Sequence, residues 1–171
     1  MPHDIGGPEV EGHEVEGHEV GGHEVEATAI SRAAPDVIFK HLCVAEAWDE
    51  WGGFLVRARR ESAGTDHPNG IGAVRYVRPR REEVVAWDPP RHYGYIALAW
   101  PPSRRFRADV TLEPHFTGTL IRWRGVFDGF PGIRPLTRAV LRRRFDSYAR
   151  RVARHSERCE PGCPARLPGA L

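Results

Sequence analysis

The sequence predicts a single α+β domain in which one long helix near the C-terminus packs on an antiparallel sheet. Apolar residues between positions 133 and 152 recur at steps of three and four, which places them on one face of a helix. Short alternating segments separated by turn signals precede this helix, without the repeated strand–helix alternation of a doubly wound sheet. A length of 171 residues is enough for one domain with a proper core plus a tail.

The first elements are expected to be one strand followed by two short helices. Residues 25–30 alternate between apolar and polar side chains, as a half-buried strand does. Pro35 fits the first turn of a short helix that runs through Leu42. Residues 44–51 resemble a second short helix, which Gly52 and Gly53 close.

Six further strands are expected before the long helix, because glycine or proline turn signals separate six segments that alternate in polarity. They cover residues 54–60, 72–79, 81–88, 92–100, 104–114 and 119–127. The long helix is expected within 131–158. Pro131 and Pro135 fit only ahead of it or in its first turn, and Pro161 and Gly162 lie beyond its end.

The predicted organisation is an acidic tail over residues 1–24, a folded domain over 25–158 and a short C-terminal tail over 159–171. Residues 6–25 repeat with a period of five and hold too few large apolar groups to fold alone. His13, His18 and His23 recur in this repeat, but a step of five gathers them on one face of neither a helix nor a strand. We therefore expect a disordered tail without a dedicated metal site.

Three cysteines do not make a disulfide framework. Cys43 falls in a predicted helix and is expected to be a buried thiol. Cys159 and Cys163 have a C-x3-C spacing that could bind a metal or oxidise, but no second ligand pair accompanies them. The sequence therefore predicts no metal and no cofactor. It also shows neither a signal peptide nor a bilayer-spanning apolar run, so a cytoplasmic protein without a transmembrane segment is expected.

Charge is distributed unevenly along the chain. Residues 1–26 hold eight of the 23 acidic residues and no Lys or Arg, so the remainder has 25 basic residues against 15 acidic ones. Lys40 is the only lysine. An arginine-rich field of this kind could attract anionic lipid or an acidic carrier protein, or simply reflect the base composition of the gene. Nucleic acid is the least expected partner, because no reader motif and no interleaved exposed aromatics are present.

Several short motifs occur in an order that resembles the sequences of the START-like, or SRPBCC, superfamily and its polyketide cyclase/dehydrase branch. The similarity extends over about residues 25–157. The motifs are Ser-Arg-Ala-Ala-Pro-Asp-Val-Ile-Phe at 31–39, Trp-Asp-Glu-Trp at 48–51, Gly-Ala-Val-Arg at 72–75, Glu82 ahead of Val-Val-Ala-Trp-Asp-Pro-Pro-Arg at 84–91, and Gly-Thr-Leu-Ile-Arg-Trp at 118–123.

This resemblance implies a helix-grip fold, in which a seven-stranded antiparallel sheet curls around the long C-terminal helix and two short helices close one end. Proteins of this kind keep a cavity between sheet and helix for a lipid, sterol, polyketide or other apolar ligand. Carriers, sensors and aromatase/cyclases all occur among them. The branch has no universal catalytic motif that could be carried over to this chain.

Strand alternation predicts which side chains face the concave side of the sheet and would line such a cavity. An ordinary packed core would use the same residues, and an error of one residue in strand phase would exchange the two faces. The predicted ligand-binding residues are Phe54, Val56, Val74, Tyr76, Tyr93, Tyr95, Phe106, Ala108, Val110, Ile121, Trp123, Phe127, Leu141, Phe145 and Tyr148.

Glu82 and Tyr95 are the candidate catalytic residues, since a buried carboxylate or phenol must be paired or have a shifted pKa. Glu82 with a nearby tyrosine could orient a carbonyl-bearing ligand and act as acid or base in a cyclisation or dehydration. The competing interpretation is that Glu82 pairs with a neighbouring arginine on the sheet. His92 and His115, at strand ends, are expected on the surface.

Three functions follow as expectations. The first is a carrier or sensor that binds a small hydrophobic ligand between sheet and helix. The second is a polyketide cyclase or dehydratase that uses the same cavity and receives an acidic carrier protein on the arginine face of the helix. The third is peripheral binding of an acidic partner through that face. The sequence leaves open whether the protein is an enzyme.

Overall fold

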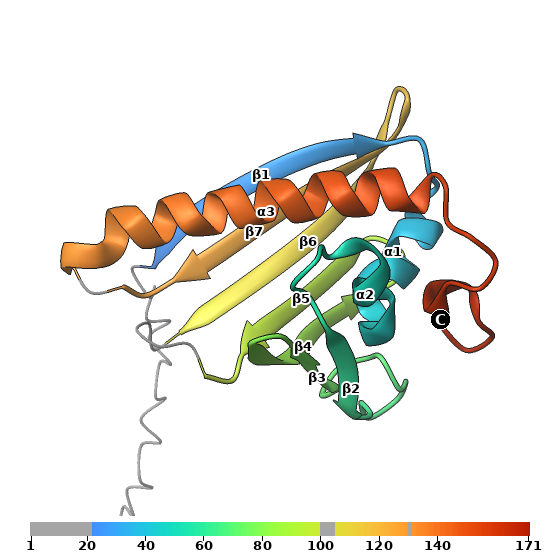
Figure 1. The fold of residues 1–171 in the computed structure, drawn as a ribbon, viewed down its shortest axis with the longest axis horizontal. Helices are drawn as coiled ribbons and strands as arrows, with labels where there is room; N and C mark the ends of the chain where they lie inside the picture. Colours follow the sequence, from blue (N-terminus) through green and yellow to red (C-terminus); the bar gives the residue numbers. More distant parts are fainter. Residues whose placement is uncertain (1–21, 100–104, 130) are drawn as a thin grey trace, which may run out of the picture.

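The computed structural model describes residues 22–99, 105–129 and 131–171, and in it one antiparallel sheet of seven strands curls around a long helix (Figure 1). Each strand pairs with its neighbour in the order β1-β7-β6-β5-β4-β3-β2, so the chain forms a meander and β1 closes against the last strand. The strands are β1 His23–Ser31, β2 Ala58–Ser62, β3 Val74–Val77, β4 Arg80–Asp88, β5 His92–Ala97, β6 Phe106–His115 and β7 Gly118–Phe127. The expected helix-grip arrangement is confirmed.

The two short helices after β1 close one end of the grip (Figure 1). Helix α1 spans Pro35–Cys43, and a 3₁₀ turn η1, Ala45–Ala47, leads into the single turn of α2, Trp48–Trp51. Side chains cap the free carbonyls at the end of α1: the indole nitrogen of Trp48 donates to Leu42 O at 2.9 Å, and that of Trp51 donates to His41 O at 3.1 Å. The tryptophans that fill the core therefore also hold the short helices in place.

Helix α3, Arg134–Ser156, follows a 3₁₀ turn η2, Pro131–Ile133, and lies across β1 and β7 (Figure 1). Its C-terminal two thirds bury the expected apolar stripe against the sheet. Gly125 of β7 permits this close contact, because a Cβ there would lie only 2.5 Å from the Phe145 ring. The buried members of the stripe are Leu141, Phe145, Tyr148, Ala149 and Val152.

The expectation that the first turns of this helix are also packed is wrong. Ile133, Leu136 and Val140 are 37%, 67% and 56% exposed. In Figure 1 the N-terminal end of α3 extends past β3, β4 and β5, and the buried part of the stripe begins only at Leu141. The apolar spacing correctly predicts the helix, but not which part of its stripe is buried.

A second difference concerns the strand expected at residues 54–60, because β2 begins only at Ala58. Gly53 has φ +112°, and the amide of Val56 donates to Gly53 O at 3.0 Å, so a tight turn occupies the first positions of the predicted strand. Phe54 and Leu55 belong to this α2–β2 loop and are 91% and 70% exposed.

The two ends of the described chain pack differently from the expected tails. His23 is the first residue of β1, and its ring centroid lies 5.7 Å from that of Phe127, whereas His13 and His18 lie outside the described residues. The segment after α3 includes a 3₁₀ turn, η3 Pro164–Arg166, that contacts α1 and η1. Cys163, Ala165 and Ala170 of this segment are buried. Over the described ranges, no helix is long and apolar enough to cross a membrane.

Candidate ligand site on the concave face

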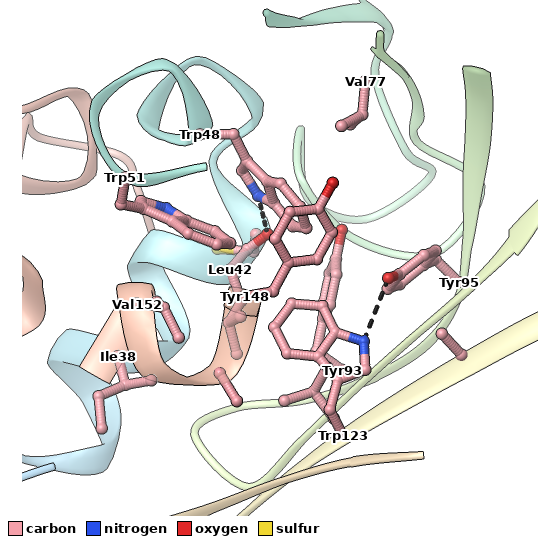
Figure 2. Packing of buried hydrophobic residues seen from close by; sticks show 14 of the residues in the cluster. Ile38, Leu42, Trp48, Trp51, Val77, Tyr93, Tyr95, Trp123, Tyr148 and Val152 are labelled. Atoms are coloured by element: carbon pink, nitrogen blue, oxygen red, sulfur yellow. Dashed lines mark hydrogen bonds between the residues drawn. The ribbon is translucent and has the colours of Figure 1, made fainter. Parts of the chain in front are cut away.

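Aromatic side chains from the short helices, the sheet and α3 meet at the centre of the concave face (Figure 2). The Trp48 and Trp51 rings lie 4.3 Å apart, measured between centroids, and both rings contact Trp123 and Tyr148. Phe145 stacks on Trp123 at 5.9 Å. These rings are at most 7% exposed, so the described structure has a packed aromatic cluster where the sequence predicts the ligand.

A charged side chain lies inside this cluster. Arg75 of β3 is 2% exposed, and its Nε and Nη2 donate to Oε2 of Glu82, directly opposite on β4, at 3.1 and 2.9 Å. Its Nη1 donates to Leu42 O at 2.7 Å, at the C-terminal end of α1, where the helix dipole favours a cation. The guanidinium therefore joins β3, β4 and α1 within the core.

The same guanidinium stacks against three rings. Its carbon lies 4.5 Å from the centroid of Trp48, 4.8 Å from that of Tyr95 and 5.1 Å from that of Tyr93. Contacts of this kind stabilise a cation more strongly when water is excluded. Burial raises the pKa of the Glu82 carboxyl, and the adjacent Arg75 limits that rise. Glu82 faces inward as predicted, and it pairs with a neighbouring arginine as the competing interpretation expects; its catalytic role stays a prediction.

Three tyrosine hydroxyls lie in or beside the cluster and have different partners. Tyr95 Oη accepts a hydrogen bond from Nε1 of Trp123 at 3.3 Å, and Tyr148 Oη accepts one from Nε of Arg144 at 2.8 Å. Tyr93 Oη is buried and has no hydrogen-bond partner within the part of the chain that the structure describes. A buried hydroxyl without a partner is costly, so the Tyr93 hydroxyl is a natural anchor for a bound polar group.

Burial raises the pKa values of Tyr93, Tyr95 and Tyr148 above the ordinary value of 10.0. A raised folded-state pKa contributes stability that is complete below the unfolded value and is lost as the pH rises. We therefore expect the protein to unfold above about pH 10, and the phenolate absorbance of these residues to appear together with the loss of circular dichroism. If the phenolate signal of all four tyrosines rises while the fold persists, these hydroxyls are accessible and the packed cluster is incorrect.

The structure brings most of the predicted ligand-binding residues together on the concave side. Twelve of the fifteen are buried: Val56, Tyr93, Tyr95, Phe106, Ala108, Val110, Ile121, Trp123, Phe127, Leu141, Phe145 and Tyr148. Phe54, Val74 and Tyr76 were placed on this face wrongly. Phe54 is in the exposed α2–β2 loop, and on β3 the buried positions are Arg75 and Val77.

The error on β3 has a physical cause. Alternation was assigned on the premise that apolar side chains point inward, but this strand buries an arginine, and a shift of one residue exchanges the faces. Tyr76 alternates with the buried positions of β3, and its ring centroid lies 4.9 Å from the guanidinium carbon of Arg59. The sequence signal that could have identified Arg75 is its position opposite Glu82, seven residues along the same hairpin.

One side of α3 continues from the cluster toward solvent. Arg144 faces Tyr148, and its charge acts on Glu82, so this side of the helix is turned toward β4. Val140 lies four residues before Arg144 and therefore neighbours it on that side, whereas Leu136, eight residues before Arg144, is turned about 80° further round the helix. Both are exposed. Val140 is thus the exposed apolar residue that lies one helical turn before Arg144 on this side.

The α2–β2 loop lies next to the same side of the helix. A Cβ on Gly53 would be 3.4 Å from the guanidinium carbon of Arg151, which is seven residues after Arg144. Phe54 and Leu55, which follow directly, are exposed. We refer to Phe54, Leu55, Leu136 and Val140 as the apolar rim.

The predicted surface histidines lie away from this site. His92 is half-buried, and its Nε2 is 2.8 Å from Oδ1 of Asp109, which also pairs with Arg107. These residues alternate with the buried positions of β5 and β6, so they lie on the outer face of the sheet. His115 is exposed beside the β6–β7 turn, with Nδ1 3.2 Å from Oγ1 of Thr117.

A sheet that grips a long helix, with aromatic residues between them, is the helix-grip fold. The family described as "polyketide cyclase / dehydrase and lipid transport" matches residues 22–157, well over half of the sequence, and the chain belongs to it. No curated protein matches the sequence.

Solved structures share the fold at low sequence identity. A START superfamily protein from Mycobacterium smegmatis superposes with a TM-score of 0.67 at 13% identity, covering 81% of this chain and 100% of that one. Protein MLL2253 from Mesorhizobium loti gives 0.62 at 16% identity, with 81% and 99% covered. DynU16, a putative protein in the dynemicin biosynthetic locus, gives 0.60 at 18% identity, with 84% of this chain and 49% of that chain covered.

Proposed function

We propose that this protein binds a small apolar molecule bearing one polar oxygen group on the concave side of the sheet, as a carrier or sensor. The observation that carries the proposal is the buried Tyr93 hydroxyl, which has no hydrogen-bond partner among the described residues. The Tyr93 ring lies against the guanidinium of the Arg75–Glu82 pair. Ligand sites typically combine an apolar lining with a few convergent polar groups that fix orientation. A ligand carbonyl or hydroxyl oxygen would accept the Tyr93 hydrogen bond, and the surrounding rings would bind its apolar body.

The apolar rim supports the same proposal from the surface. Phe54 and Leu55 of the α2–β2 loop and Leu136 and Val140 of α3 are each more than half exposed. Exposed apolar side chains near an apolar interior are a feature of ligand-binding surfaces. Because the cluster is packed, the proposed binding requires the rings to move apart as the ligand passes the rim.

A cyclase or dehydratase remains the second candidate, because the family description includes that chemistry and Glu82 faces the interior with Tyr95. In the described structure Arg75 engages Oε2 of Glu82 with two hydrogen bonds, which restricts this carboxylate as a proton acceptor. The carrier role is therefore favoured. Turnover of a polyketide-like chain that disappears in Glu82→Gln, while ligand affinity survives, would favour the enzyme instead.

Titration with an apolar fluorescent probe tests the proposed function. We expect Val140→Glu, which introduces a charge on the rim, to weaken probe binding at least tenfold. The matched control is Phe116→Glu, because Phe116 is 100% exposed in the β6–β7 turn, away from the rim. Tyr93→Phe should weaken an oxygen-bearing ligand more than a pure hydrocarbon, since a lost hydrogen bond contributes about 1 kcal/mol. Equal loss in both glutamate variants, or none, contradicts the proposal.

An acidic partner is the third candidate, and a groove between α3 and β1 favours it. The groove has a volume of about 1170 Å³, and its lining includes Arg134, Arg138, Arg142, Arg143 and Arg150. An acidic protein surface could bind there with a strong dependence on salt, because exposed charges are screened. Binding that weakens steeply with ionic strength and is lost in Arg138→Glu with Arg142→Glu would support this candidate.

A further inference from the structure

Two histidines and two cysteines converge at the closed end of the fold, away from the aromatic cluster. His41 comes from α1, His155 from the last turn of α3, and Cys159 and Cys163 from the segment that follows. One donor atom from each residue lies within 4.8 Å of the other three. The Nε2 atom of His41 is 3.1 Å from Sγ of Cys159 and 3.6 Å from Sγ of Cys163, which is 3.7 Å from Nε2 of His155.

The separations between these sulfur and nitrogen atoms are close to those of a tetrahedral metal centre. Zinc binds thiolate sulfur at about 2.3 Å and imidazole nitrogen at about 2.0–2.1 Å, which places two ligands of a tetrahedron about 3.4–3.8 Å apart. Two of the three distances from sulfur to nitrogen, 3.6 and 3.7 Å, lie within this range, and the third, 3.1 Å, is slightly shorter. The donor set, two thiolates and two imidazoles, matches that of structural zinc sites, and the two thiolate charges would balance the dication.

The hydrogen bonding and burial of His41 suit a metal ligand. Its Nδ1 lies 2.7 Å from Val37 O, a carbonyl that can only accept, so Nδ1 carries the proton and Nε2 presents a lone pair to the two sulfurs. Histidine ligands of zinc commonly donate their other nitrogen to a backbone carbonyl in this way. His41 is 1% exposed, and Cys163 is 5% exposed, so the centre is largely shielded from water.

We propose that His41, His155, Cys159 and Cys163 bind one zinc ion as a structural centre. All four positions would be filled by the protein, so the centre holds the chain together and leaves no open position for a substrate. It would fasten the C-terminal segment and the end of α3 to α1. A neighbouring pocket of about 750 Å³, whose lining includes Lys40, Cys159 and Arg166, offers a route for the ion.

This site is not visible in the sequence because one of its four ligands, His41, is far from the other three along the chain. The C-x3-C pair extends to H-x3-C-x3-C when His155 is included, but His41 is 118 residues before Cys159. No second ligand pair accompanies the cysteines along the chain, so the expectation of no metal follows from the sequence alone. The packing of α1 against α3 brings His41 beside His155 and the two cysteines.

Cobalt substitution of the full chain tests the proposal without depending on any variant. After removal of metal by a chelator under reducing conditions, one equivalent of Co²⁺ should restore tetrahedral visible bands and a thiolate-to-cobalt charge-transfer band. Zinc should displace the cobalt with a stoichiometry of one per chain. The histidines of the N-terminal repeat cannot produce the thiolate band, because residues 1–26 contain no cysteine.

Matched variants distinguish the centre from other uses of the same side chains. Cys159→Ser and His155→Ala, at half-buried positions, should lose the tight zinc and the charge-transfer band, whereas Cys43→Ala should keep both. Chelation should lower the Tm of the parent chain by several degrees and leave the Tm of Cys159→Ser unchanged. The proposal is overturned if the parent chain gives no thiolate band, or if mass spectrometry finds a Cys159–Cys163 disulfide and no zinc in protein purified without oxygen.

Discussion

Replacing Arg75 by methionine is expected to lower the free energy of unfolding by about 3–5 kcal/mol, the cost of removing one partner of a buried ion pair. The substitution removes both Arg75 hydrogen bonds to the buried Glu82 carboxylate, and it removes one of the two hydrogen bonds that Leu42 O accepts, the other coming from Trp48. It also removes the cation from three aromatic rings. Urea unfolding followed by tryptophan fluorescence measures this loss, because Trp48 and Trp123 report on the same cluster.

The double variant Arg75→Met with Glu82→Leu separates the cost of the unpaired charge from the cost of lost packing. Replacing both partners of a buried pair by apolar residues is often neutral or stabilising. We therefore expect the double variant to recover most of the stability lost in Arg75→Met. If the single variant costs less than about 1 kcal/mol, the typical value of an exposed pair, Arg75 is not buried as described. A double variant as unstable as the single one would show that packing of the arginine, not charge pairing, dominates.

Trp123→Ala is expected to have the second large effect, a loss of about 3–5 kcal/mol, as for other buried aromatic residues reduced to alanine. Trp123 is fully buried at the centre of the cluster. Its ring contacts those of Trp48, Trp51, Phe145 and Tyr148. The alanine leaves a cavity among rings that cannot collapse fully. An apolar cavity of this kind stays dry and binds small aromatic molecules, so benzene or indole should restore part of the lost stability.

Trp123→Phe is the matched control, because it keeps an aromatic ring in the same place and removes the hydrogen bond from Nε1 to Tyr95 Oη. We expect it to lose much less stability than the alanine variant and to show little rescue by indole. Equal destabilisation by the two substitutions would attribute the effect to the hydrogen bond. Thermal unfolding with and without the small aromatic molecule measures both quantities.

The sequence predicts the fold well because the fold depends on patterns that are local in the chain. Alternation within each strand, the glycine and proline turns between strands, and the steps of three and four in α3 are all visible without knowing the partners of any residue. The family resemblance implied a seven-stranded sheet curled around the helix, and the pairing of β1 with β7 closes that sheet in the structure. The position of Gly118 fits this closure, since it has φ +144° and a Cβ there would collide with Ser31 O.

The details of the site depended on contacts that the sequence does not display. Arg75 was overlooked because a buried arginine breaks the rule that apolar residues face inward, and Val74 and Tyr76 were assigned to the wrong face for the same reason. Whether Val140 is covered depends on how far β3, β4 and β5 extend beneath α3. No local sequence pattern determines that extent. The His41 ligand was hidden by its distance along the chain from the cysteines.

The measurement that tests the central claim most directly is native mass spectrometry of the full chain after incubation with long-chain fatty acids and with polyketide-like phenols. We predict one adduct per chain for at least one of these classes, retained in Phe116→Glu and lost in Val140→Glu. Such a pattern would place an apolar ligand at the rim and the concave face. A chain that remains bare with every compound, or an adduct equally abundant in both variants, would contradict ligand binding at this site.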